Sequence, residues 1–185
     1  GDFSAETPEG RNFWFGIREH AMAAICNGIA YDGLFRVSAA TFCVFVDYMR
    51  ASIRVAALSG LPVTYILTHD SVAVGEDGPT HQPVEQLGML RLMPNFNLWR
   101  PCDPVETAVA WRSAIESVHT PTGLSLSRQN LPFCQRSDAQ VAAIARGGYV
   151  LRECDGTPEI ILIATGSEVS LALEAADQLT ADGRK

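Results

Sequence analysis

The chain has 185 residues, 47% of them apolar, and a formal net charge of −7 at pH 7. A chain of this length can bury a full core, so one domain plus part of a second is expected. The negative charge argues against nucleic acid or an anionic membrane as a partner. An anionic substrate would need a local basic site.

The cysteines and the hydropathy pattern indicate a cytoplasmic protein. The five cysteines form no C-x-x-C pair, and an odd number is unlike a disulfide framework. Reduced thiols are typical of the cytoplasm. No signal peptide and no apolar run of about 18 residues is present, so no membrane association is expected.

Strands and helices alternate along the chain. Apolar residues at helical spacing predict helices over residues 17–30, 42–58, 84–93, 103–118, 138–146 and 165–179. Apolar, often β-branched runs predict strands over residues 34–40, 63–68, 96–100, 124–127, 149–153 and 159–164. Residues 12–15 suit either a short strand or an ordered approach to the first helix.

Two helix starts carry local signals. The sequence Asp103-Pro104-Val105-Glu106 combines an Asp cap, a Pro at the first helical position and a Glu three residues after the cap. Thr165-Gly166-Ser167 follows an expected strand, and we expect Ser167 to cap the helix after it. Such a turn can also bind an anion, but a single turn is a weak signal for that.

The alternation of strands and helices predicts a three-layer α/β/α fold with a mostly parallel sheet covered on both faces. Gly147-Gly148 marks the expected boundary between a domain of residues 1–146 and the first elements of a second α/β domain, residues 147–185. No closing strand follows the last expected helix, so we expect the chain to be part of something longer.

The stretch Thr68–Pro83 is rich in titratable side chains and reads T-H-D-S-V-A-V-G-E-D-G-P-T-H-Q-P. It leaves the carboxyl end of an expected parallel strand, where open α/β sheets bind ligands. The favoured interpretation is a polyol or phosphate site in which His69, Asp77 and His81 face the ligand. A solvated surface turn is one alternative, and a metal site that adds Asp70 to these three residues is another.

Other side chains admit two interpretations each. Glu19 lies in the first turn of a helix, where a carboxylate either complements the helix dipole or serves a ligand. Arg128 ends a strand and suits either a surface ion pair or a phosphate. Phe42, Phe45 and Tyr48 share one helix face, which is either core or the lining of a pocket.

Several motifs resemble those of one enzyme family. The loop Thr68–Pro83 resembles the active-site loop of transketolases, in the domain that binds the pyrimidine of thiamine diphosphate. F-G-I-R-E-H-A-M at Phe15–Met22, T-F-x-x-F-x-x-Y at Thr41–Tyr48 and L-S-R-Q-N at Leu126–Asn130 are similar to segments of the same family. The order and spacing fit, and the resemblance covers essentially the whole chain.

The resemblance implies a thiamine-diphosphate-binding fold and a cofactor site. Glu19 would hydrogen-bond the pyrimidine nitrogen opposite the 4′-amino group and so favour the tautomer that removes the thiazolium proton. Phe45 would stack on the pyrimidine ring, and Phe42 and Tyr48 would line its pocket. His81 would lie near the amino group and the reacting oxygen and assist proton transfer.

The resemblance also implies the substrate and the reaction. His69 and Arg128 would hold the phosphate of a sugar phosphate, His81 would lie at its reacting end, and Asp77 would bind a hydroxyl. The reaction is transfer of a two-carbon ketol unit from a ketose phosphate to an aldose phosphate, a step of the pentose phosphate pathway.

Part of the family's site has no counterpart in the chain. The family binds the diphosphate and a divalent cation, Mg²⁺ or Ca²⁺, through an upstream domain with a G-D-G…N segment. The dipeptide Asp77-Gly78 here follows Glu76 instead of a glycine, and it belongs to the loop Thr68–Pro83 that the resemblance assigns to the sugar. In the family the site forms between the two subunits of a homodimer. We therefore expect half a site, with negligible activity and weak cofactor binding by the chain alone.

Two alternatives to a transketolase are left open. Dihydroxyacetone synthase and deoxyxylulose-phosphate synthase use the same cofactor, and the D-G-P-T-H-Q-P loop occurs in much of that wider group, although His69 and L-S-R-Q-N favour transketolase. A non-catalytic module that only dimerises is the other alternative. The intact set of site residues argues against it.

Overall fold

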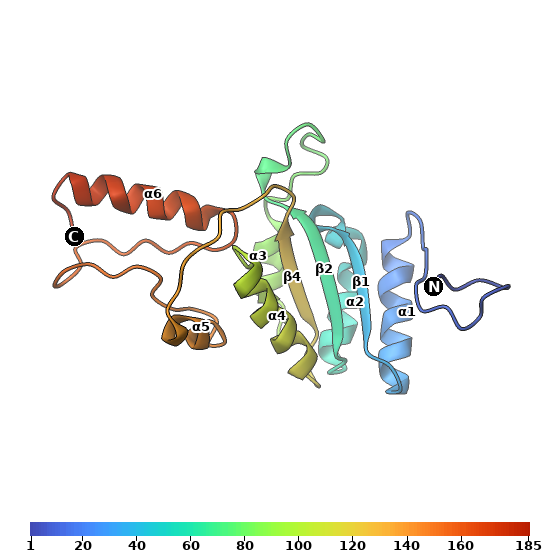
Figure 1. Cartoon of the computed structure of the whole chain (residues 1–185). Coiled ribbons are helices and arrows are strands. Elements are labelled where there is room, and N and C mark those ends of the chain that lie inside the picture. Colours follow the sequence, from blue (N-terminus) through green and yellow to red (C-terminus); the bar gives the residue numbers. More distant parts are fainter.

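The computed structural model describes residues 1–185 and contains a sheet of four parallel strands (Figure 1). The strands are β1 (Val37–Phe42), β2 (Val63–Asp70), β3 (Asn97–Trp99) and β4 (Thr122–Ser127). Their order across the sheet is β1-β2-β4-β3, and every neighbouring pair is parallel. The predicted parallel α/β sheet is therefore confirmed.

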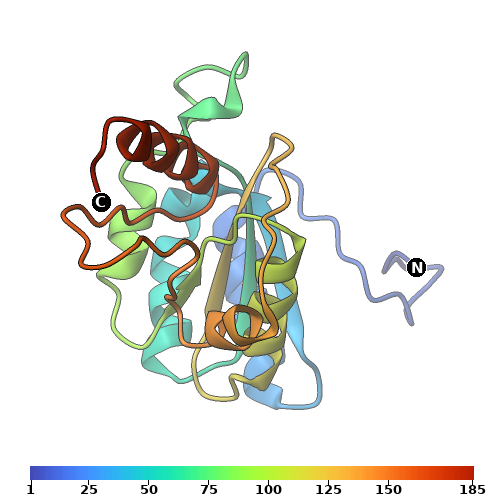
Figure 2. The same ribbon diagram turned by 60° about the vertical axis from the view of Figure 1, so that its left-hand side comes forward.

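Helices cover both faces of the sheet. They are α1 (Glu19–Asp32), α2 (Val46–Leu58), α3 (Gln86–Arg91), α4 (Pro104–Glu116), α5 (Asp138–Ile144) and α6 (Glu168–Ala181), with short 3₁₀ helices η1 (Cys43–Phe45) and η2 (Val72–Val74). One core joins α1, α2 and α3 to the sheet, and α4 lies on the opposite face. Figure 2 shows α6 and the N-terminal arm on opposite sides of the sheet. No helix is long and apolar enough to cross a membrane.

Alternation along β2 decides which side chains enter the main core. Val63, Tyr65 and Leu67 point to α1 and α2 and are fully buried. Thr64 points the other way, beside Trp111 of α4. The Tyr65 hydroxyl donates to the Asn27 side chain at 3.4 Å, so its polar end has a partner. Burying an apolar side chain of this size contributes about 1.5–3 kcal/mol, so this face of β2 anchors the domain.

The connection from β1 to α2 differs from the continuous helix predicted over residues 42–58. Phe42 is extended, with φ −66° and ψ 145°, and the single 3₁₀ turn of η1 follows before α2 begins at Val46. Met49 and Ile53 then enter the core, whereas Tyr48 is 65% exposed. The side chains of Phe42, Phe45 and Tyr48 therefore lie at the rim of the sheet, because the turn of η1 separates them from the core-facing side of α2.

The predicted ends of the other helices are confirmed in one case and wrong in two. Asp103 caps α4 as predicted, its carboxylate accepting from the Glu106 N–H at 3.0 Å. The first helix starts at Glu19 rather than residue 17, and it ends at Gly33, whose φ is 81°. Ser167 does not cap α6: its side chain accepts no backbone N–H, so that prediction is wrong.

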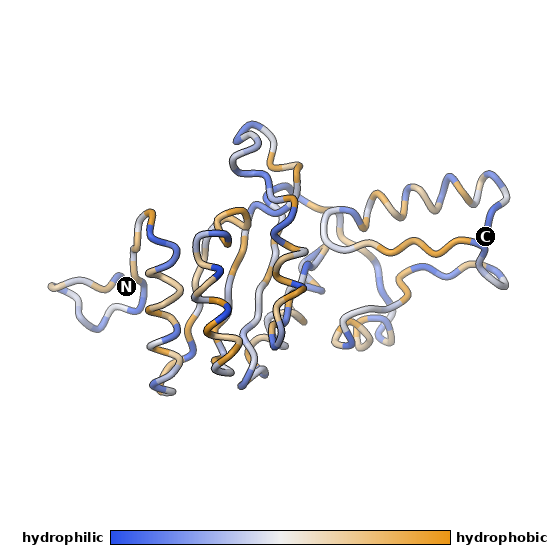
Figure 3. The backbone as a smooth tube through the Cα atoms, turned by 180° about the vertical axis from the view of Figure 1, so that it is seen from behind, coloured by the Kyte–Doolittle hydropathy of each residue, from blue (hydrophilic) through white to orange (hydrophobic).

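The predicted strands over residues 149–153 and 159–164 are absent. Figure 3 shows the second of these segments as an apolar run beside α6. Its first two N–H groups, those of Glu159 and Ile160, donate to the Lys185 carbonyl at 2.7 and 3.0 Å. No strand pairs with the rest, and a strand needs such a ladder whatever its apolar pattern. Residues 12–15 form no strand either, and Asn12 makes one bridge, to Asp2.

A buried arginine fastens the segment after β4 to the start of α4. The Arg136 guanidinium donates to Asp103 at 2.5 Å and to Glu106 at 3.2 Å. Its Nε donates to the Tyr149 hydroxyl at 2.6 Å. The side chains of Arg136 and Asp103 are only 1% and 0% exposed, so each charge depends on the other.

Stability should depend on pH through Asp103. Burial raises the pKa of this carboxyl, but hydrogen bonds from Arg136 and from the Glu106 and Cys134 N–H groups outweigh burial and hold the pKa below its ordinary value. A carboxyl group whose pKa is lower in the folded than in the unfolded state stabilises the fold at pH values above its unfolded-state pKa of about 3.9. That stabilisation is lost as the pH falls through the folded-state pKa.

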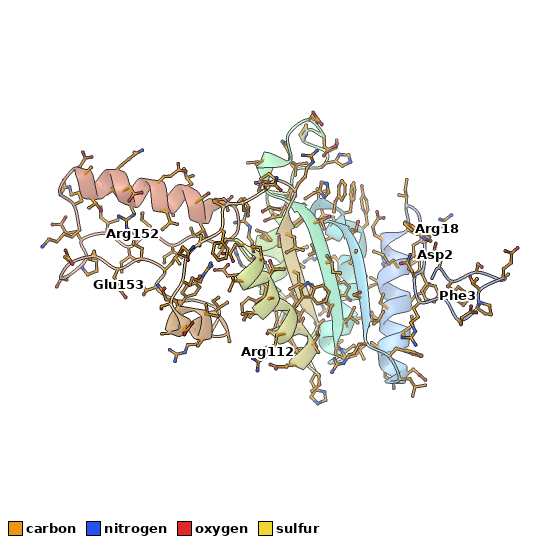
Figure 4. The ribbon with its side chains drawn as sticks, viewed as in Figure 1. Asp2, Phe3, Arg18, Arg112, Arg152 and Glu153 are labelled. Carbon is orange, nitrogen blue, oxygen red and sulfur yellow. The ribbon has the colours of Figure 1, made fainter.

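We therefore expect Asp103→Asn, which can still cap α4, to lower the unfolding free energy by about 3 kcal/mol at neutral pH. The deficit should shrink as pH falls below about 4, measured by urea denaturation. Asp177→Asn, at an exposed ion pair with Arg152, which is labelled in Figure 4, is the control and should cost at most about 1 kcal/mol. A deficit independent of pH would contradict the prediction.

Candidate active site

The candidate site lies at the edge of the sheet where the strands end and α1 begins (Figure 1). Figure 4 places Arg18, the residue before α1, at this edge. In β2, Leu67 pairs with Ser125 of β4, but Asp70 pairs with Ser127, so β2 carries one extra residue between the two pairs. Such a bulge re-aims the side chains within it.

The backbone on either side of Asp70 is unusual. His69 has φ 59°, and Ser71 has φ 80° with ψ 160°, a region that is essentially restricted to glycine. The turn at His69 brings its ring over Phe42, with centroids 3.5 Å apart and an interplanar angle of 15°. The strained backbone at His69 and Ser71 therefore accompanies a fixed orientation of the His69 imidazole, stacked on Phe42.

The site contains an aromatic–histidine cluster, made of Phe42, Phe45, Tyr48, His69 and His81. The Phe42 and Phe45 rings are nearly parallel, at 10°, with centroids 6.1 Å apart. Tyr48 extends the row, 6.0 Å from Phe45. His81 meets both phenylalanines edge-on, at 6.1 and 5.3 Å. The structure thus brings together five of the residues singled out in the sequence.

The loop after β2 folds back on itself and delivers His81. Gln82 donates to the Val72 carbonyl at 2.9 Å, and the His81 N–H donates to the Gly78 carbonyl at 3.0 Å. His81 Nδ1 lies 2.8 Å from the Thr80 hydroxyl, which leaves Nε2 without a protein partner. Asp77, nearer the tip of the loop, is exposed.

Glu19 and Arg128 share this edge but are not bonded to the cluster. Glu19 opens α1, is half-buried, and its carboxylate takes part in no ion pair. Arg128 follows β4 directly and is exposed. The next side chain, Gln129, has a buried Oε1 with no hydrogen-bond partner. The carboxylate of Glu19 and the guanidinium of Arg128 are therefore available to a ligand at this edge.

The structure argues against the metal alternative for the loop. The carboxylate of Asp70 accepts from Arg100 Nε at 2.5 Å, so a guanidinium already occupies it. His69 is stacked on Phe42. Arg100 was missed in the sequence, although it ends a predicted strand just as Arg128 does, and that position was the signal that could have found it.

A second set of possible ligand atoms lies at the start of α4. The Sγ atoms of Cys102 and Cys134 and an Asp103 oxygen are all within 4.8 Å of one another. Arg136 donates to both Asp103 and Cys102 Sγ, the latter at 3.3 Å. Burial, followed by the charge of Glu106, raises the pKa of the Cys102 thiol. The set is thus arranged around a cation that the chain itself supplies.

The fold and the cluster define a ligand-binding α/β domain with an aromatic wall at the carboxyl edge of its sheet. Residues 2–133 match the family model of the transketolase pyrimidine-binding domain, and residues 147–185 match that of the transketolase-like C-terminal domain. The chain belongs to the transketolase family.

Named relatives agree. Over 95% of its length the chain is 57% identical to transketolase 2 of Vibrio parahaemolyticus, and over 97% it is 56% identical to the transketolase of Bacillus subtilis. It spans 26% and 27% of those two proteins.

Solved structures give the same result. A transketolase of Pichia stipitis in complex with sedoheptulose 7-phosphate superposes with a TM-score of 0.93 at 46% identity, covering 100% of this chain and 28% of that one. An inactive β4 tetramer of a split-gene transketolase gives a TM-score of 0.75 at 26% identity, covering 96% of this chain and 55% of that one.

The conformation of Ser71 leads to a stability prediction. Because its backbone region costs a non-glycine residue about 1–3 kcal/mol, Ser71→Gly should be more stable than Ser71→Ala by about 1 kcal/mol or more. Ser59, with φ −89°, is the matched control, and there the alanine variant should be the more stable. Urea denaturation of the four variants measures both differences. Equal stability of the two Ser71 variants would refute the assigned strain.

Proposed function

We propose that the chain supplies the half of a transketolase active site that binds the cofactor pyrimidine and the sugar phosphate. The enzyme would transfer a two-carbon ketol unit from a ketose phosphate to an aldose phosphate. The observation that carries this proposal is the aromatic–histidine cluster, which lies where open α/β sheets bind ligands.

The residues present fit the pyrimidine of thiamine diphosphate. The rings of Phe42 and Phe45 are half-buried and nearly parallel, and they offer an apolar wall to a flat heterocycle. Glu19 is half-buried and free of ion pairs, as a carboxyl group that bonds a ring nitrogen must be. When bound, the cofactor supplies the nucleophilic carbon that carries the transferred unit.

The chain's own residues then bind the ring and move protons. Glu19 would hold the ring nitrogen by a hydrogen bond that partial burial strengthens. Phe45, which lies between Phe42 and Tyr48 in the row of aromatic rings, would stack on the pyrimidine ring. His81 would relay a proton through Nε2, since Nδ1 is engaged with Thr80 and imidazole can donate at one nitrogen while accepting at the other.

Sugar phosphates are the proposed substrates. Structures of the Pichia stipitis enzyme hold sedoheptulose 7-phosphate, fructose 6-phosphate and xylulose 5-phosphate, which supports this class of ligand. Arg128 would grip the phosphate through its planar fork, with His69 beside it. Asp77 would accept from a sugar hydroxyl and so select its stereochemistry.

The other half of the site would come from an upstream domain that binds the diphosphate and its Mg²⁺ or Ca²⁺, contributed across the interface of a homodimer. The likeness to an inactive β4 tetramer of a split-gene transketolase supports a half-site. We also propose a division into domains of residues 1–146 and 147–185, which is supported by family matches that end at 133 and restart at 147.

The half-site proposal is tested by complementation. We expect ketol transfer from xylulose 5-phosphate to ribose 5-phosphate, with thiamine diphosphate and Mg²⁺, only when the diphosphate-binding domain is supplied. The chain alone should show no turnover and weak cofactor binding in calorimetric titration. Tight, metal-dependent binding by the chain alone would contradict the proposal. Turnover only with formaldehyde or pyruvate as partner substrate would indicate one of the related enzymes.

Glu19 is tested in the completed enzyme. We expect Glu19→Gln to lower kcat about 100-fold or more, because an amide cannot hold the ring nitrogen as a carboxyl group does. Glu116→Gln, at an exposed ion pair on α4, is the control and should leave kcat unchanged. Steady-state assays at saturating thiamine diphosphate separate lost chemistry from lost binding. Equal activity of the two variants would rule out the role assigned to Glu19.

A further inference from the structure

We propose that Arg100 is a positioning residue through which the turn before α6 holds His69 in its place over Phe42. The proposal gives residues 165–168, in the C-terminal segment, a role in the proposed function. Its kinetic consequence rests on that function, whereas its structural consequence does not.

Arg100 joins two parts of the chain that lie far apart in sequence. Its Nε donates to Asp70 at 2.5 Å. Its Nη1 donates to the Thr165 carbonyl at 2.5 Å and forms an ion pair with Glu168. Its Nη2 donates to the Ser167 hydroxyl at 3.3 Å. Every nitrogen of the guanidinium is thus engaged, and the side chain is only 8% exposed.

The turn before α6 is shaped to receive this guanidinium. Gly166 has φ 57°, and a Cβ there would lie 2.8 Å from Arg100 Cγ and 3.0 Å from its Cζ. Only glycine therefore permits the close approach. Ser167, which leaves the backbone of α6 uncapped, instead presents its hydroxyl to Arg100. Hydrogen bonding to Arg100 lowers the pKa of Glu168, which keeps the ion pair charged.

The other partner, Asp70, lies between His69 and Ser71, which both have a positive φ. Its side chain is 2% exposed, and its backbone rejoins β4 at Ser127 after the bulge. Strained backbone persists only where surrounding contacts over-determine it. The Arg100–Asp70 pair is such a contact, and it adjoins His69 directly. Without it the bulge can relax, and the His69 ring can leave Phe42.

The structural consequence is measurable in the chain itself by NMR of the histidine ring protons. The ring current of Phe42, whose centroid lies 3.5 Å from that of His69, changes the chemical shift of the His69 ring protons. The His69 resonance is assigned as the one that disappears in His69→Gln. We expect Arg100→Lys and Glu168→Gln to move that resonance toward the position of the exposed His119. Asp177→Asn removes a comparable carboxylate from the same helix without touching Arg100, and it should leave the resonance in place.

The kinetic consequence is measured in the completed enzyme. We expect Glu168→Gln to raise the KM for the ketose phosphate about tenfold, while thiamine diphosphate binding matches that of Asp177→Asn. A merely structural role would weaken both alike.

The outcomes are decisive. An unmoved His69 resonance in folded Glu168→Gln would overturn the proposal, even if Arg100→Lys fails to fold. An equal shift in Asp177→Asn, or an unchanged KM in an active enzyme, would overturn it too. If the unsubstituted enzyme shows no ketol transfer, the proposed function fails, and the resonance shift still decides the role of Arg100.

Discussion

The extra residue in β2 is the constraint on which the site depends. It interrupts the ladder to β4 between Leu67 and Asp70, and the chain crosses the interruption with His69 in a left-handed conformation. A regular strand would have continued the alternation of side chains between the two faces of the sheet. The bulge instead aims an imidazole at the rim, where Phe42 at the end of β1 receives it.

Parallel strand order explains why the remaining groups gather at this edge. All four strands run in the same direction, so the segments after β1, β2 and β4 emerge together. Because α1 runs back against β1, its first turn reaches the same edge (Figure 1). Segments that lie far apart in the sequence thereby provide a carboxylate, an aromatic wall, two imidazoles and a guanidinium. The helices on either face contribute the rigidity that such a site requires.

Two arginines hold the parts of the chain together, and both act through buried carboxylates. Arg136 binds Asp103 at the start of α4, and Arg100 binds Asp70 at the end of β2. Neither pair is an efficient source of stability, because desolvation offsets much of the attraction. Each does impose a single geometry, since a buried charge without its partner is costly. The pairs therefore specify how the segment after β4 meets the sheet.

The sequence by itself determined the parallel α/β fold and the Asp103 cap, and the motif resemblance singled out the five side chains that the structure gathers into the aromatic–histidine cluster. Those features depend on residues close in sequence, or on motifs with fixed spacing. Only the tertiary structure decided the left-handed turn at His69 and the role of Arg100, whose partners lie 30 residues before it and 65–68 after it. It also decided against strands at residues 149–153 and 159–164, because an apolar run becomes a strand only when another strand pairs with it.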